Sequence, residues 1–201
     1  MSDDNLMALD ALQADAARPG ERLDHGDGLP EILGENGELT MLIQSVLPNA
    51  KPVRTVLFSK SEATNWAVPW HQDRVITVAD RCDVVGYSNW SRKGGTWHCE
   101  PPMSVLDNML FVRVHLDDAD AENGAMEIAL SSHKCGRVAA EEAEALATQH
   151  ETELCIAGRG DVQVLKMGML HRSRPSSSRR PRRAVRVDFT ADHLAAPLQW
   201  A

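Results

Sequence analysis

The sequence predicts a mainly β fold, with a jelly roll as the leading candidate. Short segments rich in valine, isoleucine and leucine recur from residue 53 to residue 189. Turn-forming pairs such as Asn123-Gly124 and Gly160-Asp161 separate many of these segments. Residues 139–151 (AAEEAEALATQHE) are the one insert with a clearly helical composition and no helix breaker. Many short strands with a single helical insert are typical of a barrel-like β-sandwich.

The individual elements follow from local patterns. Residues 6–17 predict a short amphipathic helix, and Pro19, Gly20, Gly26 and Gly28 indicate a loop after it. Residues 38–47 fit either a helix or a strand. Seven strands are expected after these segments, at residues 53–59, 74–79, 105–117, 125–130, 153–157, 161–167 and 183–189.

Length and composition favour one domain over residues 1–201, with residues 1–37 as an N-terminal helical and loop extension. An apolar content of 43% with mixed charge is typical of a soluble globular protein. No apolar run approaches the roughly 20 residues that span a bilayer, and the acidic N-terminus does not resemble a secretory signal. We therefore expect a cytoplasmic protein. Its four cysteines are scattered without a CxxC pair, which argues against a zinc site or a disulfide framework.

A split motif, His71-Gln72-Asp73 with His171 far along the chain, predicts a metal site. Residues i and i+2 of a strand point to the same face, so His71 and Asp73 would point together and Gln72 away from them. Two imidazoles and one carboxylate are the ligand set of non-haem Fe(II) oxygenases, which leaves positions open for oxygen and a co-substrate. The alternative is that these are ordinary polar groups of a β-sandwich that binds no metal.

Arg182 begins a predicted strand and is the candidate partner for a carboxylate of the co-substrate. Alternation along the strand places Arg182, Ala184 and Arg186 on one face and Arg183 on the other. A planar guanidinium binds a carboxylate through two hydrogen bonds, and the small Ala184 leaves room beside it. Two alternatives remain: a surface arginine in a basic run, or Arg183 in its place if the register shifts by one residue.

Arg113 is a further candidate, because alternation puts Phe111, Arg113 and His115 on one face of a strand. A carboxylate of the co-substrate or an acidic substrate would explain this cation, and a buried ion pair with Asp117 is the alternative. Lys60 is a similar but weaker candidate for binding substrate. Three histidines are excluded as ligands, because a lone histidine is more often structural: His98, His115 and His133.

Four tryptophans flank the HQD motif and the segment after it: Trp66, Trp70, Trp90 and Trp97. Indole side chains at such positions suit either a substrate mouth or packing over the ends of a barrel. Because long loops on a rigid scaffold often carry recognition, residues 82–102 are the expected determinant of substrate choice. Trp90 and Trp97 are therefore the candidate substrate contacts in this segment.

Four stretches together resemble the bacterial branch of the phytanoyl-CoA dioxygenase family of Fe(II)- and 2-oxoglutarate-dependent oxygenases. They are LFSKSEATNWAVPWHQD, VRVHLDDADAENGAMEIALSSHKCGR, GDVQVLKMGMLHRS and RRAVRVDF, and the likeness runs from about residue 53 to the C-terminus. The resemblance implies a double-stranded β-helix, a cupin-like jelly roll. It also implies Fe(II) as the metal, 2-oxoglutarate and O2 as co-substrates, and a small molecule as the substrate that is hydroxylated.

The resemblance also implies roles for individual residues. His71, Asp73 and His171 match the iron ligands, Arg182 matches the arginine that binds the distal carboxylate of 2-oxoglutarate, and Ser173 matches a hydroxyl that assists it. In related halogenases the position of Asp73 resembles Gly or Ala, so the carboxylate here favours oxygen insertion over chlorination.

This sequence departs from the family pattern in two places. Ser176 stands where the family usually has Asn, and Ser131-Ser132-His133 replaces the usual Gly-Ser-His. Neither change touches the three metal ligands, but both lie in segments expected to shape the pocket.

Two other classes of function are compatible with the sequence. One is a non-catalytic ligand-binding module on the same barrel. The other is nucleic-acid binding through the basic segment from Arg172 to Arg186, which contains seven arginines. The net charge of −8 disfavours nucleic acid as a partner. A small-molecule substrate and no membrane association are the expected interactions.

Overall fold

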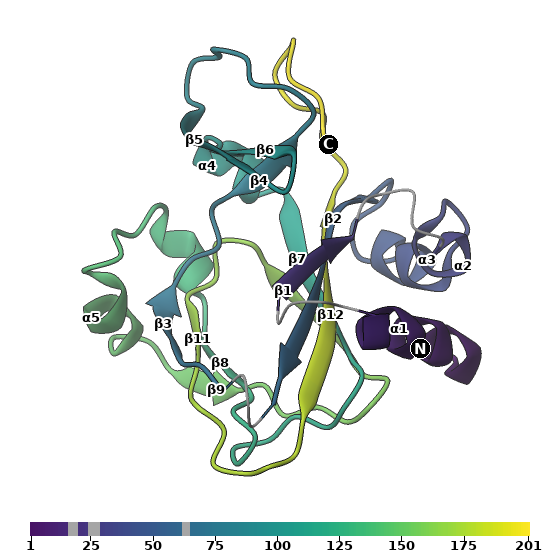
Figure 1. The fold of residues 1–201 in the computed structure, drawn as a ribbon. Helices are drawn as coiled ribbons and strands as arrows, with labels where there is room; N and C mark the ends of the chain where they lie inside the picture. Colours follow the sequence, from purple (N-terminus) through teal and green to yellow (C-terminus); the bar gives the residue numbers. More distant parts are fainter. Residues whose placement is uncertain (16–19, 24–28, 62–64) are drawn as a thin grey trace.

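The computed structural model describes residues 1–15, 20–23, 29–61 and 65–201, and antiparallel sheets dominate it (Figure 1). The main sheet has the strand order β1 (Gly20–Leu23), β2 (Lys51–Lys60), β12 (Arg182–Thr190), β7 (Met109–His115) and β10 (Val162–Lys166). A second sheet has the order β3 (Val68–His71), β11 (His171–Ser173), β8 (Met126–Ala129) and β9 (Thr152–Leu154). A small third sheet contains β4 (Ile76–Val78), β6 (Thr96–Glu100) and β5 (Ser88–Lys93).

Three helices cover the outer face of the main sheet: α1 (Asp3–Asp15), α2 (Pro30–Leu33) and α3 (Glu38–Gln44) (Figure 1). Leu6 and Leu9 of α1 stand three residues apart, and Leu39 and Ile43 of α3 four apart, so each pair lies on one helix face. These four side chains are buried in one apolar cluster with Val185 and other residues of the sheet. Burial of this cluster holds the three helices against the outer face of the sheet.

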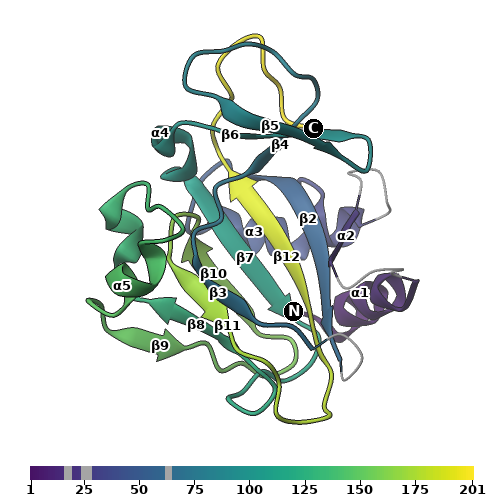
Figure 2. The same ribbon diagram turned by 60° about the vertical axis from the view of Figure 1, so that its left-hand side comes forward.

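The inner face of the main sheet is opposed by the second sheet, and the pocket described below lies between them (Figure 2). Alternation along β12 separates the two faces as predicted. Val185 and Val187 belong to the outer apolar cluster, whereas Arg182 and Arg186 line the pocket. One strand therefore supplies both core side chains and charged groups.

The predicted strands are present in the structure, which is mainly β as expected. The helix predicted at residues 6–17 is α1, and its predicted last two residues lie outside the described part of the chain. Residues 38–47, for which helix and strand were both possible, form α3 and the turn after it. None of the helices in the described residues is both long and apolar enough to cross a membrane.

Three local expectations need correction. Gly20 lies in β1, not in a loop, because residues 20–23 pair with β2; Pro19, Gly26 and Gly28 fall outside the described residues. The segment 82–102 contains a β-hairpin, β5 and β6, whose turn is Gly94-Gly95 with both φ angles positive. The helical insert at 139–151 contains only a five-residue helix, α5 (Ala143–Ala147), flanked by turns.

Two further short helical segments complete the described elements: α4 (Met103–Leu106) before β7, and a 3-10 helix at Ser132–Cys135 after β8.

Candidate active site

His71, Asp73 and His171 lie together at one end of the pocket. His71 is the last residue of β3 and pairs directly with His171, the first residue of β11. One ligand atom from each of the three residues lies within 4.8 Å of the other two. The amide of Gln72 points away and is held by the Gly168 carbonyl oxygen at 2.8 Å, as alternation predicts. Within the described residues, this is the one group of three or more His, Cys, Asp or Glu side chains suited to hold a metal ion.

Backbone carbonyl groups orient both imidazoles. Nδ1 of His71 donates to the Pro69 oxygen at 2.8 Å, and Nδ1 of His171 donates to the Met169 oxygen at 2.9 Å. In a neutral ring with its proton on Nδ1, Nε2 keeps the lone pair that a metal ion requires, and Nε2 of both histidines faces Asp73. Burial and the neighbouring His171 lower the pKa of His71, which favours the neutral form of its ring.

Asp73 is held in its ionised form. Burial alone would raise its pKa, but Arg186 and His171 overcome this effect and hold the pKa well below the usual range. Arg186 donates a hydrogen bond to Oδ2, and Nε2 of His171 lies 3.3 Å from the same oxygen. The residues thus provide the ligand types that suit Fe(II), namely two imidazoles and one carboxylate.

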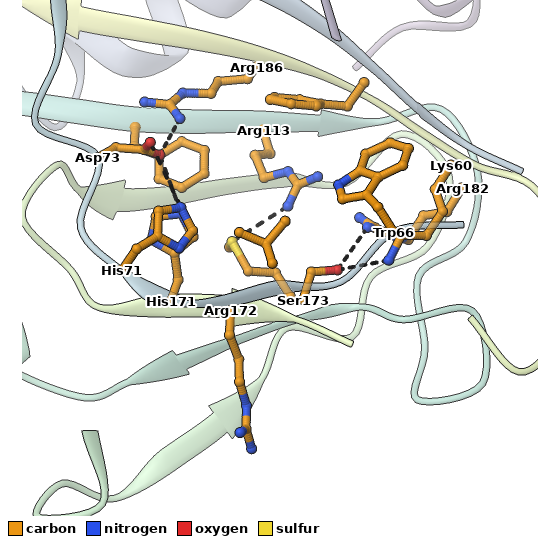
Figure 3. Close-up of a pocket in the computed structure, with 14 residues that line it drawn as sticks. Lys60, Trp66, His71, Asp73, Arg113, His171, Arg172, Ser173, Arg182 and Arg186 are labelled. Carbon is orange, nitrogen blue, oxygen red and sulfur yellow. Dashed lines mark hydrogen bonds and ion pairs between the residues drawn. The ribbon is translucent and has the colours of Figure 1, made fainter. Parts of the chain in front are cut away.

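The pocket has a volume of about 240 Å³ and extends from these three residues to a cluster of cations. Figure 3 shows the three candidate metal ligands at one end, Lys60 and Arg182 at the other, and Arg113 between them. Apolar side chains form much of the remaining wall: Phe58, Trp66, Val68, Phe111 and Met126. The pocket therefore combines a candidate metal centre with a positively charged far end.

At the far end, Arg182 and Lys60 share one hydroxyl group. Nη2 of Arg182 donates to Oγ of Ser173 at 3.2 Å, and Nζ of Lys60 donates to the same oxygen at 3.1 Å. Ser173 in turn donates to the Gly124 carbonyl oxygen at 2.9 Å. Burial, followed by the charges of Arg182 and Arg113, lowers the pKa of Lys60 to about 8. Two cations held this close indicate a site for an anion.

Arg113 is buried in the middle of the pocket without an acidic partner among the described residues. Its Nη1 donates to the Met126 sulfur at 3.4 Å, and its Nε has no hydrogen-bond partner in that part of the chain. Asp117, the alternative partner considered from the sequence, instead binds Arg183. Nε of Arg182 is likewise buried without a described partner. Because buried donors are normally satisfied, these groups fit a ligand with two carboxylates.

The basic segment is largely neutralised within the molecule. Arg183 lies on the opposite face from Arg182, with Nη2 at 2.7 Å from Asp117. Arg172 pairs with Glu127 at 2.8 Å and points away from the pocket (Figure 3). Arg180 pairs with Asp120 at 2.6 Å. These ion pairs give no support to a phosphate-binding arm.

Trp90 and Trp97 do not line this pocket. They lie on β5 and β6 of the third sheet, where their rings meet edge to face at 6.5 Å. Trp66 is the tryptophan that lines the pocket, 5.5 Å from Nζ of Lys60. The segment 82–102 contains β5 and β6 of the third sheet, which lies beyond one end of the main sheet (Figure 1).

Arg186 is the charged pocket residue to which the sequence assigned no role. Alternation placed it on the same face as Arg182, but its partner Asp73 stands 113 positions away in the sequence. Nothing in the local pattern indicates that pair.

Comparisons with known proteins identify a family that matches this sequence and solved structures that have a similar fold. The sequence model of phytanoyl-CoA dioxygenase (PhyH) matches residues 11–184. AviO1 from Streptomyces viridochromogenes Tue57 is similar in structure, with 19% identity, a TM-score of 0.62, and coverage of 98% of this chain and 88% of AviO1. EctD from S. alaskensis, solved with bound Fe, has 16% identity and a TM-score of 0.69 over 98% of this chain and 73% of EctD.

HygX from Streptomyces hygroscopicus, solved with nickel and 2-oxoglutarate, has 12% identity and a TM-score of 0.63. That match covers 94% of this chain and 78% of HygX. A search of the curated proteins gives no match. The match of the family model over most of the chain, on a mainly β fold with this group of three ligands, shows that the protein belongs to the phytanoyl-CoA dioxygenase family of Fe(II)- and 2-oxoglutarate-dependent oxygenases, which have a jelly-roll fold.

Proposed function

We propose that this protein uses Fe(II), 2-oxoglutarate and O2 to hydroxylate a small-molecule substrate, with residues 1–201 acting as one domain. The observation that carries the proposal is the layout of the pocket, where the three ligands occupy one end and Arg182, Ser173 and Lys60 the other (Figure 3). The packing of α1–α3 on the main sheet supports the one-domain assignment, since the N-terminal part contributes to that core.

Each end of the pocket has a distinct role. His71 and His171 would hold iron through Nε2, and Asp73 through its carboxylate; bound iron supplies the redox chemistry with O2. Arg182 and Ser173 would hold the distal carboxylate of 2-oxoglutarate. Arg113 lies between the two ends and would balance the remaining negative charge of the co-substrate.

Lys60 fits the co-substrate end better than a substrate site, because it shares Ser173 with Arg182. For contact with the substrate, Trp66 is the better tryptophan than Trp90 or Trp97, because it lines the pocket. The apolar walls exclude water from the reacting groups and orient the substrate. Because Asp73 supplies a third protein ligand, the product should be oxidised and not chlorinated.

The experiment is turnover with purified protein, Fe(II), 2-oxoglutarate and O2, in a large excess of chloride. Candidate substrates are first selected by the rise in melting temperature that they cause under anaerobic conditions, which requires binding but no turnover. We expect succinate formation coupled to a substrate product heavier by one oxygen atom. A chlorinated product would overturn the reaction class, and binding of iron and 2-oxoglutarate without any succinate would favour the non-catalytic module.

A further inference from the structure

Arg186 is a buried guanidinium whose contacts fix it on every side. It is 3% exposed, and Nε donates to Oδ1 of Asp188 at 2.7 Å. Nη1 donates to Oδ2 of Asp73, and Nη2 lies 3.4 Å from the sulfur of Met167. The guanidinium also lies 4.2 Å from the centre of the Phe111 ring. Such a side chain is preorganised, so it has little freedom to lose when it acts on a neighbour.

We propose that Arg186 is the positioning residue of the metal centre, which fixes Asp73 so that one carboxylate oxygen is presented to the metal and the other is withheld. Arg186 donates to Oδ2, which also lies 3.3 Å from Nε2 of His171, whereas Oδ1, 3.9 Å from Nε2 of His71, accepts no hydrogen bond from the described residues. A carboxylate that binds through one oxygen leaves more coordination positions for other ligands. This inference rests on the proposed function, because it assumes that the three residues bind a metal.

Arg186 belongs to a row of neighbouring side chains whose charges alternate in sign. Asp188 is 1% exposed and lies between Arg186 and Arg54, whose Nη1 is 3.5 Å from Asp188 Oδ2. Arg54 and Asp188 are direct partners across β2 and β12. The order Arg54, Asp188, Arg186, Asp73 thus ends at the candidate metal centre. In a buried setting each charge needs its neighbour, since removing one partner leaves an uncompensated charge.

The position of Asp73 argues against a purely structural role for Arg186. Asp188 lies on the same strand face as Arg186 and accepts a hydrogen bond from its Nε. If Arg186 only stabilised the sheet, the negative charge of Asp188 would be a sufficient partner. Asp73 lies outside the main sheet, two residues past the end of β3. Arg186 therefore joins the main sheet to the ligand-bearing segment. Together with Arg182, four residues earlier on the same face, it lets β12 reach both ends of the pocket.

The test measures metal affinity and coordination without turnover. Fe(II) affinity is determined anaerobically by competition with a chromophoric chelator, and the visible spectrum of the Co(II)-loaded protein reports ligand geometry. We compare Arg186→Met, Arg186→Lys and Asp188→Asn with the wild type. Arg183→Met is the matched control, because Arg183 is also ion-paired but lies on the opposite face of the same strand.

Loss of an outer partner of a metal ligand typically weakens metal binding about 10–100-fold, and we expect this loss for Arg186→Met. Arg186→Lys should lose less because it keeps the charge, and Asp188→Asn should also bind more weakly than wild type. The Co(II) spectrum should change in Arg186→Met, and Arg183→Met should match wild type in both measurements.

Near-UV circular dichroism and the melting temperature establish which variants fold. If Arg186→Met does not fold, Arg186→Lys and Asp188→Asn decide the matter. Folded variants that bind Fe(II) with wild-type affinity and give the wild-type Co(II) spectrum would overturn the role of Arg186. A wild-type protein that binds no metal would instead overturn the proposed function, so the two failures are distinguishable.

Discussion

At the scale of single residues, Lys60 shows how surroundings decide what a side chain does. Its side chain is 1% exposed and lies near two arginines, Arg182 and Arg113, with no acidic partner among the described residues. Burial first, and then the two arginines, lower its pKa to about 8. A bound dicarboxylate would reverse this effect, since an opposite charge stabilises the protonated amine.

Lys60 therefore predicts a pH dependence for co-substrate binding. Below about pH 8 the amine is charged in both the free and the bound protein, and affinity for 2-oxoglutarate is greatest. Above that pH the free protein loses the proton, and binding must take it up again. Affinity should then fall by at most about tenfold per pH unit.

Anaerobic titration of the Fe(II)-loaded protein with 2-oxoglutarate between pH 7 and pH 9 measures this dependence. In Lys60→Met the affinity should be lower and the decrease above pH 8 should disappear. If the variant keeps the wild-type pH slope, another group is responsible for it.

At the scale of secondary-structure elements, the register of strand β12 decides which arginine faces the pocket. Arg182 pairs with Lys60 across the sheet, and Arg183 pairs with Ser59, so alternation sends their side chains to opposite faces. Arg183 is bound to Asp117 and Asp10 on the helix-covered side. The register thus turns Arg182, and not Arg183, toward the pocket that we propose binds the co-substrate.

Substitutions along this strand and β11 should therefore differ in a fixed order. Arg182→Ala should weaken 2-oxoglutarate binding by about 2–5 kcal/mol, or roughly thirtyfold to several thousandfold, because it removes one member of a buried charge pair. Ser173→Ala should cost about 0.5–1.5 kcal/mol for one hydrogen bond. Arg183→Ala should be milder than Arg182→Ala.

The charge-transfer band of Fe(II) with 2-oxoglutarate, followed anaerobically, ranks these three variants. Weaker binding in Arg183→Ala alone would contradict the register of β12 at the site. If none of the three substitutions changes the affinity for 2-oxoglutarate, the assignment of the co-substrate site is wrong.

The turn that contains Gly124, just before β8, lies against Ser173 and Lys60 at the positively charged end of the pocket. Gly124 has a φ of +72°, and a Cβ there would lie 2.5 Å from the Arg174 carbonyl oxygen and 3.1 Å from Nζ of Lys60. Gly95 also has a positive φ, +85°, but a Cβ there would meet open space. The two glycines thus share the backbone constraint and differ in their surroundings.

We expect Gly124→Ala to destabilise the protein more than Gly95→Ala. Both carry a backbone cost of about 1–2 kcal/mol for the positive φ, but only Gly124→Ala must also displace Arg174 and Lys60. Urea unfolding measures the stability, and 2-oxoglutarate affinity should fall only in Gly124→Ala. Equal effects of both substitutions on affinity would show that the turn does not shape the site.

At the scale of the whole molecule, the sequence predicts the β architecture because most of its strands bury aliphatic side chains. The candidate ligands and Arg182 are predicted from the HxD motif, the family resemblance and alternation along one strand. β1 was missed because Gly20–Leu23 has no apolar run and forms only by pairing with β2. The sequence did not predict the hairpin of β5 and β6 because the residues of both strands are mostly polar. The hairpin also depends on the pairing of β6 with β4, which is not part of the hairpin itself.

The features of the site that the sequence did not predict depend on contacts between segments that are distant in the sequence. The contact of Arg186 with Asp73 joins β12 to the segment after β3, and no local pattern contains both residues. The ion pairs that neutralise the basic segment, such as Arg172 with Glu127, also require the folded chain. The sequence favours Trp90 and Trp97 as substrate contacts, and only the fold places Trp66 in the pocket.

The central claim is that His71, Asp73 and His171 form an iron site that accepts 2-oxoglutarate. Its most direct test is the iron content of the anaerobically loaded wild type and of the His71→Ala, His171→Ala double variant, together with the charge-transfer band on adding 2-oxoglutarate. We predict one Fe(II) per chain and a band in the wild type, and neither in a double variant that remains folded. Equal iron content in the two proteins would contradict the claim.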